Sequence, residues 1–153
     1  MTPATELLRR AGLRVTTPRV AVLEVLQQHP HVDAAGVLAL ARSRAGSVSV
    51  QGVYDVLAAL DAAGVVRRIQ PAHSVARYEV DHGDNHHHVV CRGCEVIVDV
   101  PCAVGSRPCL DPAPAQVLGF AVEEAEVIYW GVCPACRAAA PTTPAITTTK
   151  ETA

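Results

Sequence analysis

The 153-residue chain has few aromatic side chains, with one Trp, three Tyr and one Phe. Because half of its residues are nonetheless hydrophobic, the core must consist mainly of Val, Leu, Ala and Ile. No apolar run approaches the ~20 residues of a membrane-spanning helix. The first 12 residues also lack the long apolar segment of a secretory signal. These absences predict a cytoplasmic protein with no membrane partner, large enough for one ordinary domain or two small ones.

The chain also lacks a strong net charge. Its formal charge is −2 at pH 7, which by itself argues against binding to nucleic acid. The charges are unevenly spread, however. Residues 1–79 contain nine Lys and Arg against six Asp and Glu, whereas residues 80–153 contain four against nine. A mildly basic first half and an acidic second half suit a DNA-contacting part joined to a metal-binding part.

The first half has the pattern of helices followed by a hairpin. Helices are expected from Thr5 to Ala11, from a Thr17 cap to His29, from an Asp33 cap to about Arg44, and from a Ser49 cap to Ala63. Two strands should follow at 65–69 and 76–80, joined by a turn at 71–74. This is the element order of a winged helix-turn-helix, in which the last helix enters the major groove of DNA.

The second half predicts short strands and irregular chain. A polar hinge is expected at 81–87, strands at 88–91, 96–100 and 121–129, and a stretch containing Pro and Cys at 101–114. The residues from 138 onward are mostly Ala, Pro and Thr, a composition that predicts disorder. The fold class is therefore α+β.

Two C-x-x-C pairs are the strongest chemical signal. They are Cys91 with Cys94 and Cys133 with Cys136. A two-residue spacer lets two thiolates face one ion, and two such pairs complete a tetrahedral sulfur site for structural Zn²⁺. The alternatives are a thioredoxin-like redox pair or two disulfides. A redox pair usually opens a helix in a βαβ unit, a context that the sequence pattern lacks. Cys102 and Cys109 are left over, either inert or as a redox-sensitive pair.

A histidine triplet lies at the junction of the two halves. In an extended strand His86 and His88 project to the same face, because side chains alternate. With carboxylates from Glu79 and Asp99, and with His31 as a weaker candidate at the start of the third helix, they suit Fe²⁺, Mn²⁺ or Zn²⁺. The alternative interpretation is a solvated polar turn.

At this point four segments resemble one known family. They are residues 12–19 (GLRVTTPR), 49–54 (SVQGVY), 84–94 (DNHHHVVCRGC) and 128–136 (IYWGVCPAC). In this order they are similar to the ferric uptake regulator (Fur) family over roughly residues 5–137. Their details look closest to its FurA/CatR/PerR-like branch of peroxide-sensing repressors.

The resemblance implies a homodimer that binds palindromic operator DNA and represses transcription. It implies a winged-helix DNA-binding domain at 1–81, a small α/β dimerisation and metal-binding domain at 82–137, and a disordered tail at 138–153. It assigns the structural zinc to the four paired cysteines and a regulatory Fe²⁺ or Mn²⁺ to His31, Glu79, His86, His88 and Asp99. DNA contacts are expected from Arg14, Arg19, Ser49, Gln51 and Tyr54.

Two further features bear on function. Asp99, where many members have Glu, resembles the peroxide-sensing branch, which loses its metal after a ligand histidine, here His31 or His86, is oxidised. Ala125 and Glu126 replace a His that many members use in an accessory metal site. The competing hypotheses are an iron- or zinc-uptake repressor that responds to metal level alone, and a small metallo- or thiol-redox enzyme. The enzyme has little support, since the sequence offers no candidate nucleophile or phosphate-binding loop.

Overall fold

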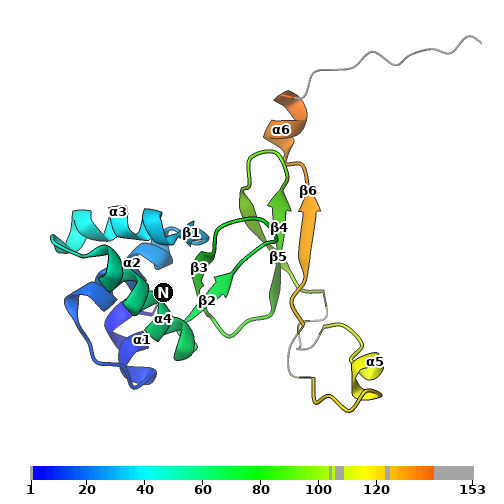
Figure 1. Ribbon diagram of the computed structural model, residues 1–153, viewed down its shortest axis with the longest axis horizontal. Coiled ribbons are helices and arrows are strands. Elements are labelled where there is room, and N and C mark those ends of the chain that lie inside the picture. Colours follow the sequence, from blue (N-terminus) through cyan, green and yellow to red (C-terminus); the bar gives the residue numbers. More distant parts are fainter. Residues whose placement is uncertain (1, 104, 106–108, 123–124, 140–153) are drawn as a thin grey trace, which may run out of the picture.

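The computed structural model describes residues 2–103, 105, 109–122 and 125–139. Four helices come first: α1 (Ala4–Arg10), α2 (Thr17–Gln28), α3 (Ala34–Ala45) and α4 (Val50–Ala62), with a short strand β1 (Val32–Asp33) before α3. They gather at one side of the molecule, and the second half of the chain extends from them as a separate sheet (Figure 1).

The helical half contains almost all of the apolar core. Its largest fully buried side chains include Leu8, Leu23, Leu26, Leu57 and Leu60. Two of the helices begin at the expected caps: Asp33 Oδ1 accepts from Gly36 N at 2.7 Å, and Ser49 Oγ accepts from Gly52 N at 2.9 Å. The Val, Leu and Ala side chains of this half therefore form one packed apolar core.

The first sheet is antiparallel, in the order β1-β3-β2, with β2 at Val66–Ile69 and β3 at Arg77–Val80. The β2–β3 hairpin is the predicted wing. The third strand, β1, was not predicted, because two residues are too few to show an alternating pattern. It pairs Val32 with Tyr78 and so fixes the residue before it, His31, against the wing.

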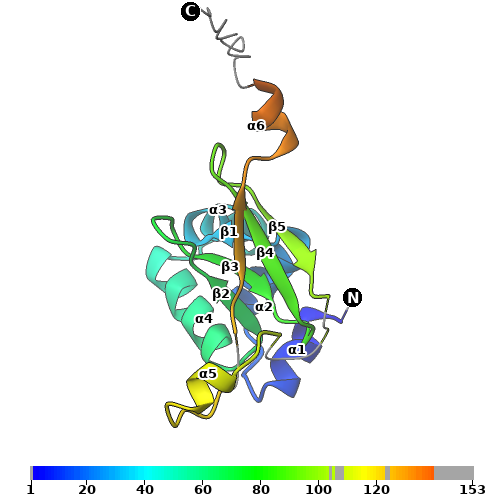
Figure 2. The ribbon, with the colours of Figure 1, turned by 90° about the vertical axis from the view of Figure 1, so that its right-hand side faces the viewer.

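The second sheet has the order β5-β4-β6, with β4 at His86–Cys91, β5 at Ile97–Pro101 and β6 at Ile128–Gly131. Figure 2 shows β4 between its two neighbours, antiparallel to β5 and parallel to β6. Two short helices precede and follow β6 in sequence, α5 (Ala113–Gln116) and α6 (Pro134–Ala139). Within the described residues, no helix has both the length and the apolar character needed to cross a bilayer.

Several predicted boundaries were wrong. Thr17 is the first residue of α2 rather than its cap, which is Thr16. The hinge ends before His86, which already belongs to β4. Of the strand expected at 121–129, the last two residues lie in β6, and residues 123 and 124 lie outside the described part. Residues 138 and 139 lie in α6 rather than in the tail, and residues 140–153 lie outside the described part. Propensity alone places such boundaries poorly, because strand pairing and packing decide where an element ends.

Candidate metal centres and DNA-contacting surface

The four paired cysteines meet at one end of the second sheet. Their sulfur atoms all lie within 4.8 Å of one another. Parallel pairing of β6 with β4 places Gly131 opposite Cys91, so Cys133 follows just beyond the first pair. Cys94 Sγ and Cys133 Sγ are 3.7 Å apart. That spacing fits the ~3.8 Å edge of a sulfur tetrahedron around zinc, calculated from a Zn–S distance of ~2.3 Å.

Backbone donors surround one of these sulfurs. Cys91 Sγ accepts from Cys133 N at 3.2 Å and from Gly93 N at 3.3 Å. Hydrogen bonds from backbone N–H groups lower the pKa of Cys91 to about 6. Hydrogen bonding with the other three sulfurs raises the pKa of Cys136 to about 12. One thiolate is thus favoured before any cation is present, and a cation is needed to deprotonate the whole set.

Gly93, between Cys91 and Cys94, has no room for a side chain because Cys136 packs against it. A Cβ on Gly93 would lie 3.0 Å from Cys136 Sγ and 3.2 Å from its Cβ. A larger residue there would push the second pair away.

The second C-x-x-C pair lies at the start of a helix. Pro134 begins α6, so Cys133 follows a strand and Cys136 lies on a helix. The local context of this pair is therefore closer to that of a redox pair than the sequence pattern indicated. The four sulfurs nevertheless form a single group, and a redox pair has no need of a second pair beside it.

A second group joins the two halves of the molecule. Strand register sets Asp99 of β5 opposite His88 of β4, and His86 points to the same side. The ligand atoms of His31, Glu79, His88 and Asp99 lie within 4.8 Å of one another. These four residues are called the histidine–carboxylate cluster below. His86 adjoins it, with Nε2 3.1 Å from Glu79 Oε1.

Glu79 is buried at the centre of this cluster. Its Oε2 lies 2.9 Å from His31 Nε2 and 3.3 Å from His88 Nε2. Asp99, whose side chain is 50% exposed, places Oδ1 2.8 Å from His31 Nε2 and 3.6 Å from His88 Nε2. The sequence predicted five candidate ligands; the fold groups the ligand atoms of four of them and places His86 next to that group.

His31 was expected at the start of the third helix, but it lies immediately before β1. Its backbone N–H donates to Tyr78 O at 2.9 Å, and its φ of 61° is in the left-handed region. A non-glycine residue pays a conformational cost there, so it needs surrounding contacts to hold it. The pairing of β1 with β3 holds the backbone and turns the imidazole toward the second sheet.

The charges in the cluster shift its titration. Burial raises the pKa of Glu79, but hydrogen bonds from His31 and His88 outweigh burial and hold it far below its usual value. Burial lowers the pKa of His31, but the hydrogen bond to Glu79 and the charge of Asp99 reverse this, so the net pKa is raised. Carboxylates and protons on the imidazoles thus stabilise each other where a cation would otherwise sit.

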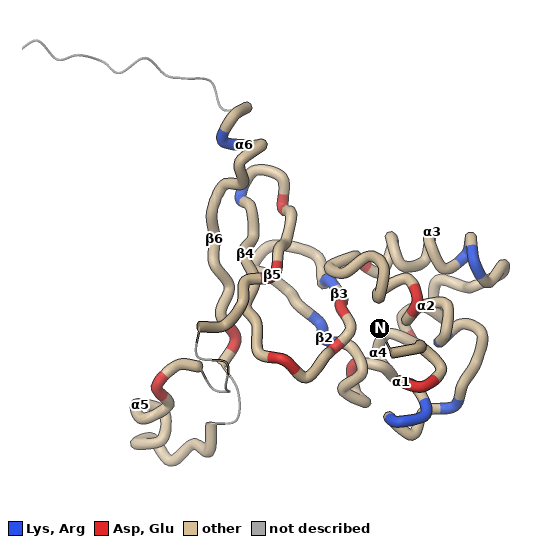
Figure 3. The backbone as a smooth tube through the Cα atoms, turned by 180° about the vertical axis from the view of Figure 1, so that it is seen from behind, with Lys and Arg blue, Asp and Glu red and all other residues tan. Residues whose placement is uncertain are grey.

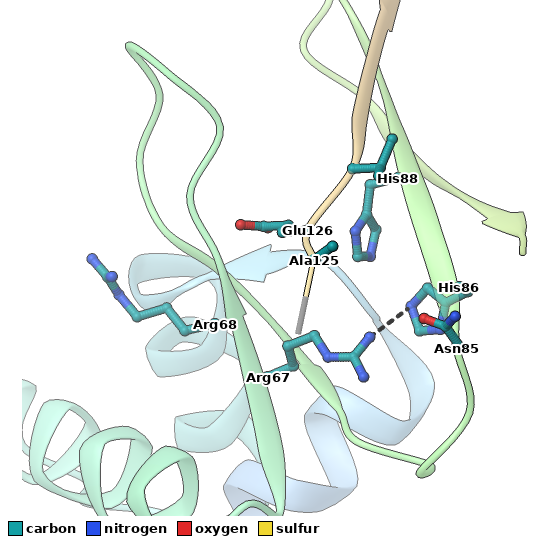
Figure 4. A pocket seen from close by; sticks show the side chains of 8 residues that line it. Arg67, Arg68, Asn85, His86, His88, Ala125 and Glu126 are labelled. Atoms are coloured by element: carbon teal, nitrogen blue, oxygen red, sulfur yellow. Dashed lines mark hydrogen bonds between the residues drawn. The ribbon is translucent and has the colours of Figure 1, made fainter. Parts of the chain in front are cut away.

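A cavity of about 340 Å³ opens beside the cluster. Figure 4 shows Arg67, from β2, pointing into it toward His86, while the neighbouring Arg68 points away. Arg67 Nη1 lies 3.5 Å from both Glu79 Oε1 and His86 Nε2. Sequence reasoning missed Arg67, because only the alternation of β2 distinguishes it from Arg68.

The donor atoms fit the two expected metals. Four thiols at tetrahedral spacing suit Zn²⁺, and a mixed imidazole–carboxylate set suits Fe²⁺, Mn²⁺ or Zn²⁺. In the histidine–carboxylate cluster, the buried Glu79 carboxylate makes hydrogen bonds with His31 and His88, and a bound cation would take the place of these hydrogen bonds.

The residues expected to contact DNA lie on the helical half. On α4, Gln51 and Tyr54 are exposed, while Val53, Val56 and Leu57 on the opposite side are buried. Ser49 is exposed too, although its hydroxyl is used as the helix cap. Arg14 and Arg19 lie next to each other, with Arg19 Nη1 donating to Arg14 O at 2.9 Å.

Figure 3 shows further basic residues at the end of α1 and the end of α3. An acidic group next to Tyr54 on α4 opposes this trend. Asp55 Oδ1 accepts from Gln51 Nε2 at 2.8 Å, so the carboxylate is partly compensated on the helix surface.

The first half has the helices and wing of a winged-helix protein, with the last helix exposed. The histidine–carboxylate cluster joins it to a sheet that carries four clustered cysteines. Together these features define a metal-binding protein of the winged-helix type. The model of the ferric uptake regulator family matches residues 10–104. The transcriptional regulator FurA of Mycobacterium tuberculosis (strain ATCC 25618 / H37Rv) is 60% identical over 131 residues, which cover 86% of this chain and 88% of that protein. Ferric uptake regulation protein 1 of Mycolicibacterium fortuitum is 57% identical over 126 residues, covering 82% and 77%.

Solved structures agree. The ferric uptake regulator from Pseudomonas aeruginosa with manganese is 29% identical, with a TM-score of 0.61, covering 88% of this chain and 99% of that one. The chain belongs to the ferric uptake regulator family, whose members are metal-responsive transcriptional regulators. The relatives are named as regulators and not as enzymes, which confirms the prediction that the chain is no enzyme.

Proposed function

We propose that the chain is a metal-dependent transcriptional repressor that binds operator DNA as a homodimer. The observation that supports this best is the contact between His31 and Asp99, 2.8 Å apart between Nε2 and Oδ1. His31 comes from the half with the helices and wing, and Asp99 from the second sheet. A cation held by both would fix the orientation of one half relative to the other.

Zn²⁺ is proposed for Cys91, Cys94, Cys133 and Cys136, in a structural role. The second sheet contributes only Val90, Cys91 and Ile97 to the buried apolar residues, so it has little core of its own among the described residues. A cation that ties β6 and α6 to the β4–β5 turn supplies stability that packing does not.

Fe²⁺ or Mn²⁺ is proposed for the histidine–carboxylate cluster, with His86 as a further ligand. When bound, the ion neutralises the carboxylates and replaces the protons on the imidazoles. Both halves contribute ligands, so the ion favours the one arrangement in which all of them converge. In a dimer this sets the distance between the two α4 helices and thereby selects operators with matching half-site spacing.

The proposed dimer interface is the face of the second sheet opposite this cluster. Val98 of β5 and Tyr129 of β6 lie on that face, and they are 51% and 49% exposed. Val132, just beyond β6, is equally open. An apolar strip of this kind suits burial against a second copy of the chain.

The test is selection of DNA from a random duplex pool by the full-length, zinc-loaded chain, with Mn²⁺ and after removal of Mn²⁺ by a weak chelator. The proposal expects a two-fold symmetric sequence to be enriched only with Mn²⁺. Equal enrichment without the ion would rule out metal dependence, and failure to enrich any sequence would rule out an operator-binding role.

Peroxide is the proposed signal, with Fe²⁺ as the metal. All five candidate ligands offer imidazole nitrogen or carboxylate oxygen and none offers sulfur. Fe²⁺ held there would activate peroxide, which would transfer one oxygen atom to a ligand imidazole and leave as water. His31 is the most consequential target, because an oxidised imidazole at that position no longer links the two halves.

The competing candidate, a sensor of metal level alone, shares the same site and differs in chemistry. Operator binding by the Fe²⁺-loaded and Mn²⁺-loaded chains, before and after brief peroxide, separates the two. Peroxide sensing expects release of DNA by the iron form only, with one added oxygen on the His31 or His86 peptide in the mass spectrum. If both forms stay bound and the peptides are unchanged, the chain responds to metal level.

A further inference from the structure

Three side chains outside the two centres meet on the other face of β4. His87 lies between His86 and His88, so its ring points away from the histidine–carboxylate cluster. Cys102 follows the end of β5, and Cys109 lies before α5. The ring nitrogen and the two sulfurs are all within 4.8 Å of one another, and Cys109 Sγ is 3.3 Å from His87 Nε2. Neither cysteine has a role in the function proposed above.

The surroundings of these atoms resemble those of a ligand set. His87 is 7% exposed, although histidine is ordinarily more open, and its ring packs edge-on against Tyr129 with centroids 6.2 Å apart. Asn85 Nδ2 donates to Cys102 Sγ at 3.3 Å. Around a bound metal, neighbouring residues typically hold the ligand imidazole in place and donate hydrogen bonds to the ligand atoms. Tyr129 and Asn85 make contacts of these two kinds here.

The chemistry of the set selects the ion. Two thiolates this close together repel each other unless a cation lies between them. Two thiolates and one imidazole favour a thiophilic cation over Fe²⁺ or Mn²⁺, which prefer oxygen and nitrogen.

We infer that His87, Cys102 and Cys109 form a third metal site, for a thiophilic cation of the Zn²⁺ type. The site shares no ligand with the cysteine cluster or with the histidine–carboxylate cluster. Three protein ligands leave one position of a tetrahedron for water or another ligand. The ion fastens the chain that follows β5 onto β4, the strand whose opposite face bears His86 and His88.

Cobalt provides the probe, because a sulfur ligand gives Co²⁺ a charge-transfer absorption that an imidazole–carboxylate site cannot give. The full-length chain, reduced and kept free of oxygen, is titrated with Co²⁺ after the cysteine cluster has been filled with zinc. The wild type is expected to develop sulfur-to-cobalt absorption while its first zinc stays bound. The C102S/C109S double variant is expected to lose that absorption and to bind one metal equivalent less.

A second variant keeps both thiols. His87→Ala is expected to weaken Co²⁺ binding to these sulfurs by at least ~10-fold, the lower end of the loss caused even by an outer-shell change. His86→Ala is the matched control on the opposite face and should leave the sulfur-to-cobalt absorption unchanged. The inference is overturned if wild type and the double variant take up equal amounts of thiolate-bound metal, or if His87→Ala binds Co²⁺ as tightly as wild type.

Discussion

His31 Nε2 lies 2.8 Å from Asp99 Oδ1, which joins the residue before β1 to the middle of β5. The two side chains come from different sheets, and Glu79 of β3 lies beside both. Without a cation, this contact is an ion pair when His31 is protonated. With one, it becomes a pair of ligands, and the same geometry serves both states.

Arg67 is expected to compete with the metal. Its guanidinium lies 3.5 Å from Glu79 Oε1, and a fixed positive charge at that distance opposes a divalent cation. Arg67→Met should raise Mn²⁺ affinity roughly 3- to 10-fold, since screening reduces the interaction to about 1 kcal/mol. Calorimetric titration with Mn²⁺ measures this. Arg68→Met, whose side chain points away, is the control, and an unchanged or lower affinity in Arg67→Met would show that the arginine supports the site.

Loss of one sulfur should destabilise the second sheet. Cys133→Ser removes a ligand and leaves β6 attached to β4 through four residue pairs. We expect zinc to be lost and the free energy of unfolding of the sheet to fall by more than the ~1–3 kcal/mol of an ordinary substitution. Metal analysis and thermal unfolding measure both. Glu95→Gln, an exposed change in the β4–β5 turn, is the control; equal stability of the two variants would argue against a structural role for the cysteine cluster.

The DNA surface predicts different effects for different side chains. Tyr54 is 51% exposed on α4, and its removal should cost about 1–3 kcal/mol on the selected operator with less effect on random DNA. Arg19→Ala should weaken binding to both and lower the salt slope by about 1, because it is expected to contact phosphate. Fluorescence anisotropy at several salt concentrations separates the two. Equal losses on both kinds of DNA for Tyr54→Ala would place it on the backbone rather than on a base.

Glu79 and His31 should make the stability of the chain without Mn²⁺ and its affinity for Mn²⁺ depend on pH in opposite directions. Glu79, with a pKa held below the ordinary 4.5, stabilises the fold above that pH and loses this effect as the pH falls toward its lowered value. His31, with a pKa raised above 6.5, stabilises the fold below 6.5 and loses this effect as the pH rises through its raised value.

The pair therefore stabilises the manganese-free, zinc-loaded chain most between about pH 4.5 and 6.5. Mn²⁺ needs neutral imidazole, so its affinity should rise as the pH increases through the raised pKa of His31. Denaturant unfolding and Mn²⁺ titration across this range measure the two trends. Glu79→Gln should reduce the pH dependence of the free energy of unfolding. A Mn²⁺ affinity that does not change with pH would contradict the assignment of His31 as a ligand.

Much of both centres could be predicted from local spacing. The C-x-x-C pairs needed only their two-residue spacers, and the alternation of β4 was enough to set His86 and His88 on one face. The helices of the first half followed from caps such as Asp33 and Ser49, where a side-chain oxygen satisfies a free N–H.

The rest depends on tertiary pairing that no local pattern encodes. The position of His31 follows from β1, a strand of two residues that exists only because β3 is beside it. Arg67 reaches Glu79 because the wing packs close to the second sheet. Cys102 and Cys109 meet His87 through the path of the chain after β5, and their spacing in sequence resembles no common metal motif.

The central claim is that one metal ion, held by His31 and Asp99 together, makes DNA binding depend on metal. The most direct measurement is the affinity of the zinc-loaded chain for the selected operator, with and without Mn²⁺, in wild type, Asp99→Ala and Glu95→Gln. Glu95 is an exposed acidic residue in the β4–β5 turn and serves as the control. We predict that Mn²⁺ tightens binding at least ~10-fold, a coupling of ~1.4 kcal/mol, in wild type and Glu95→Gln but not in Asp99→Ala. A full metal response in Asp99→Ala would contradict the account.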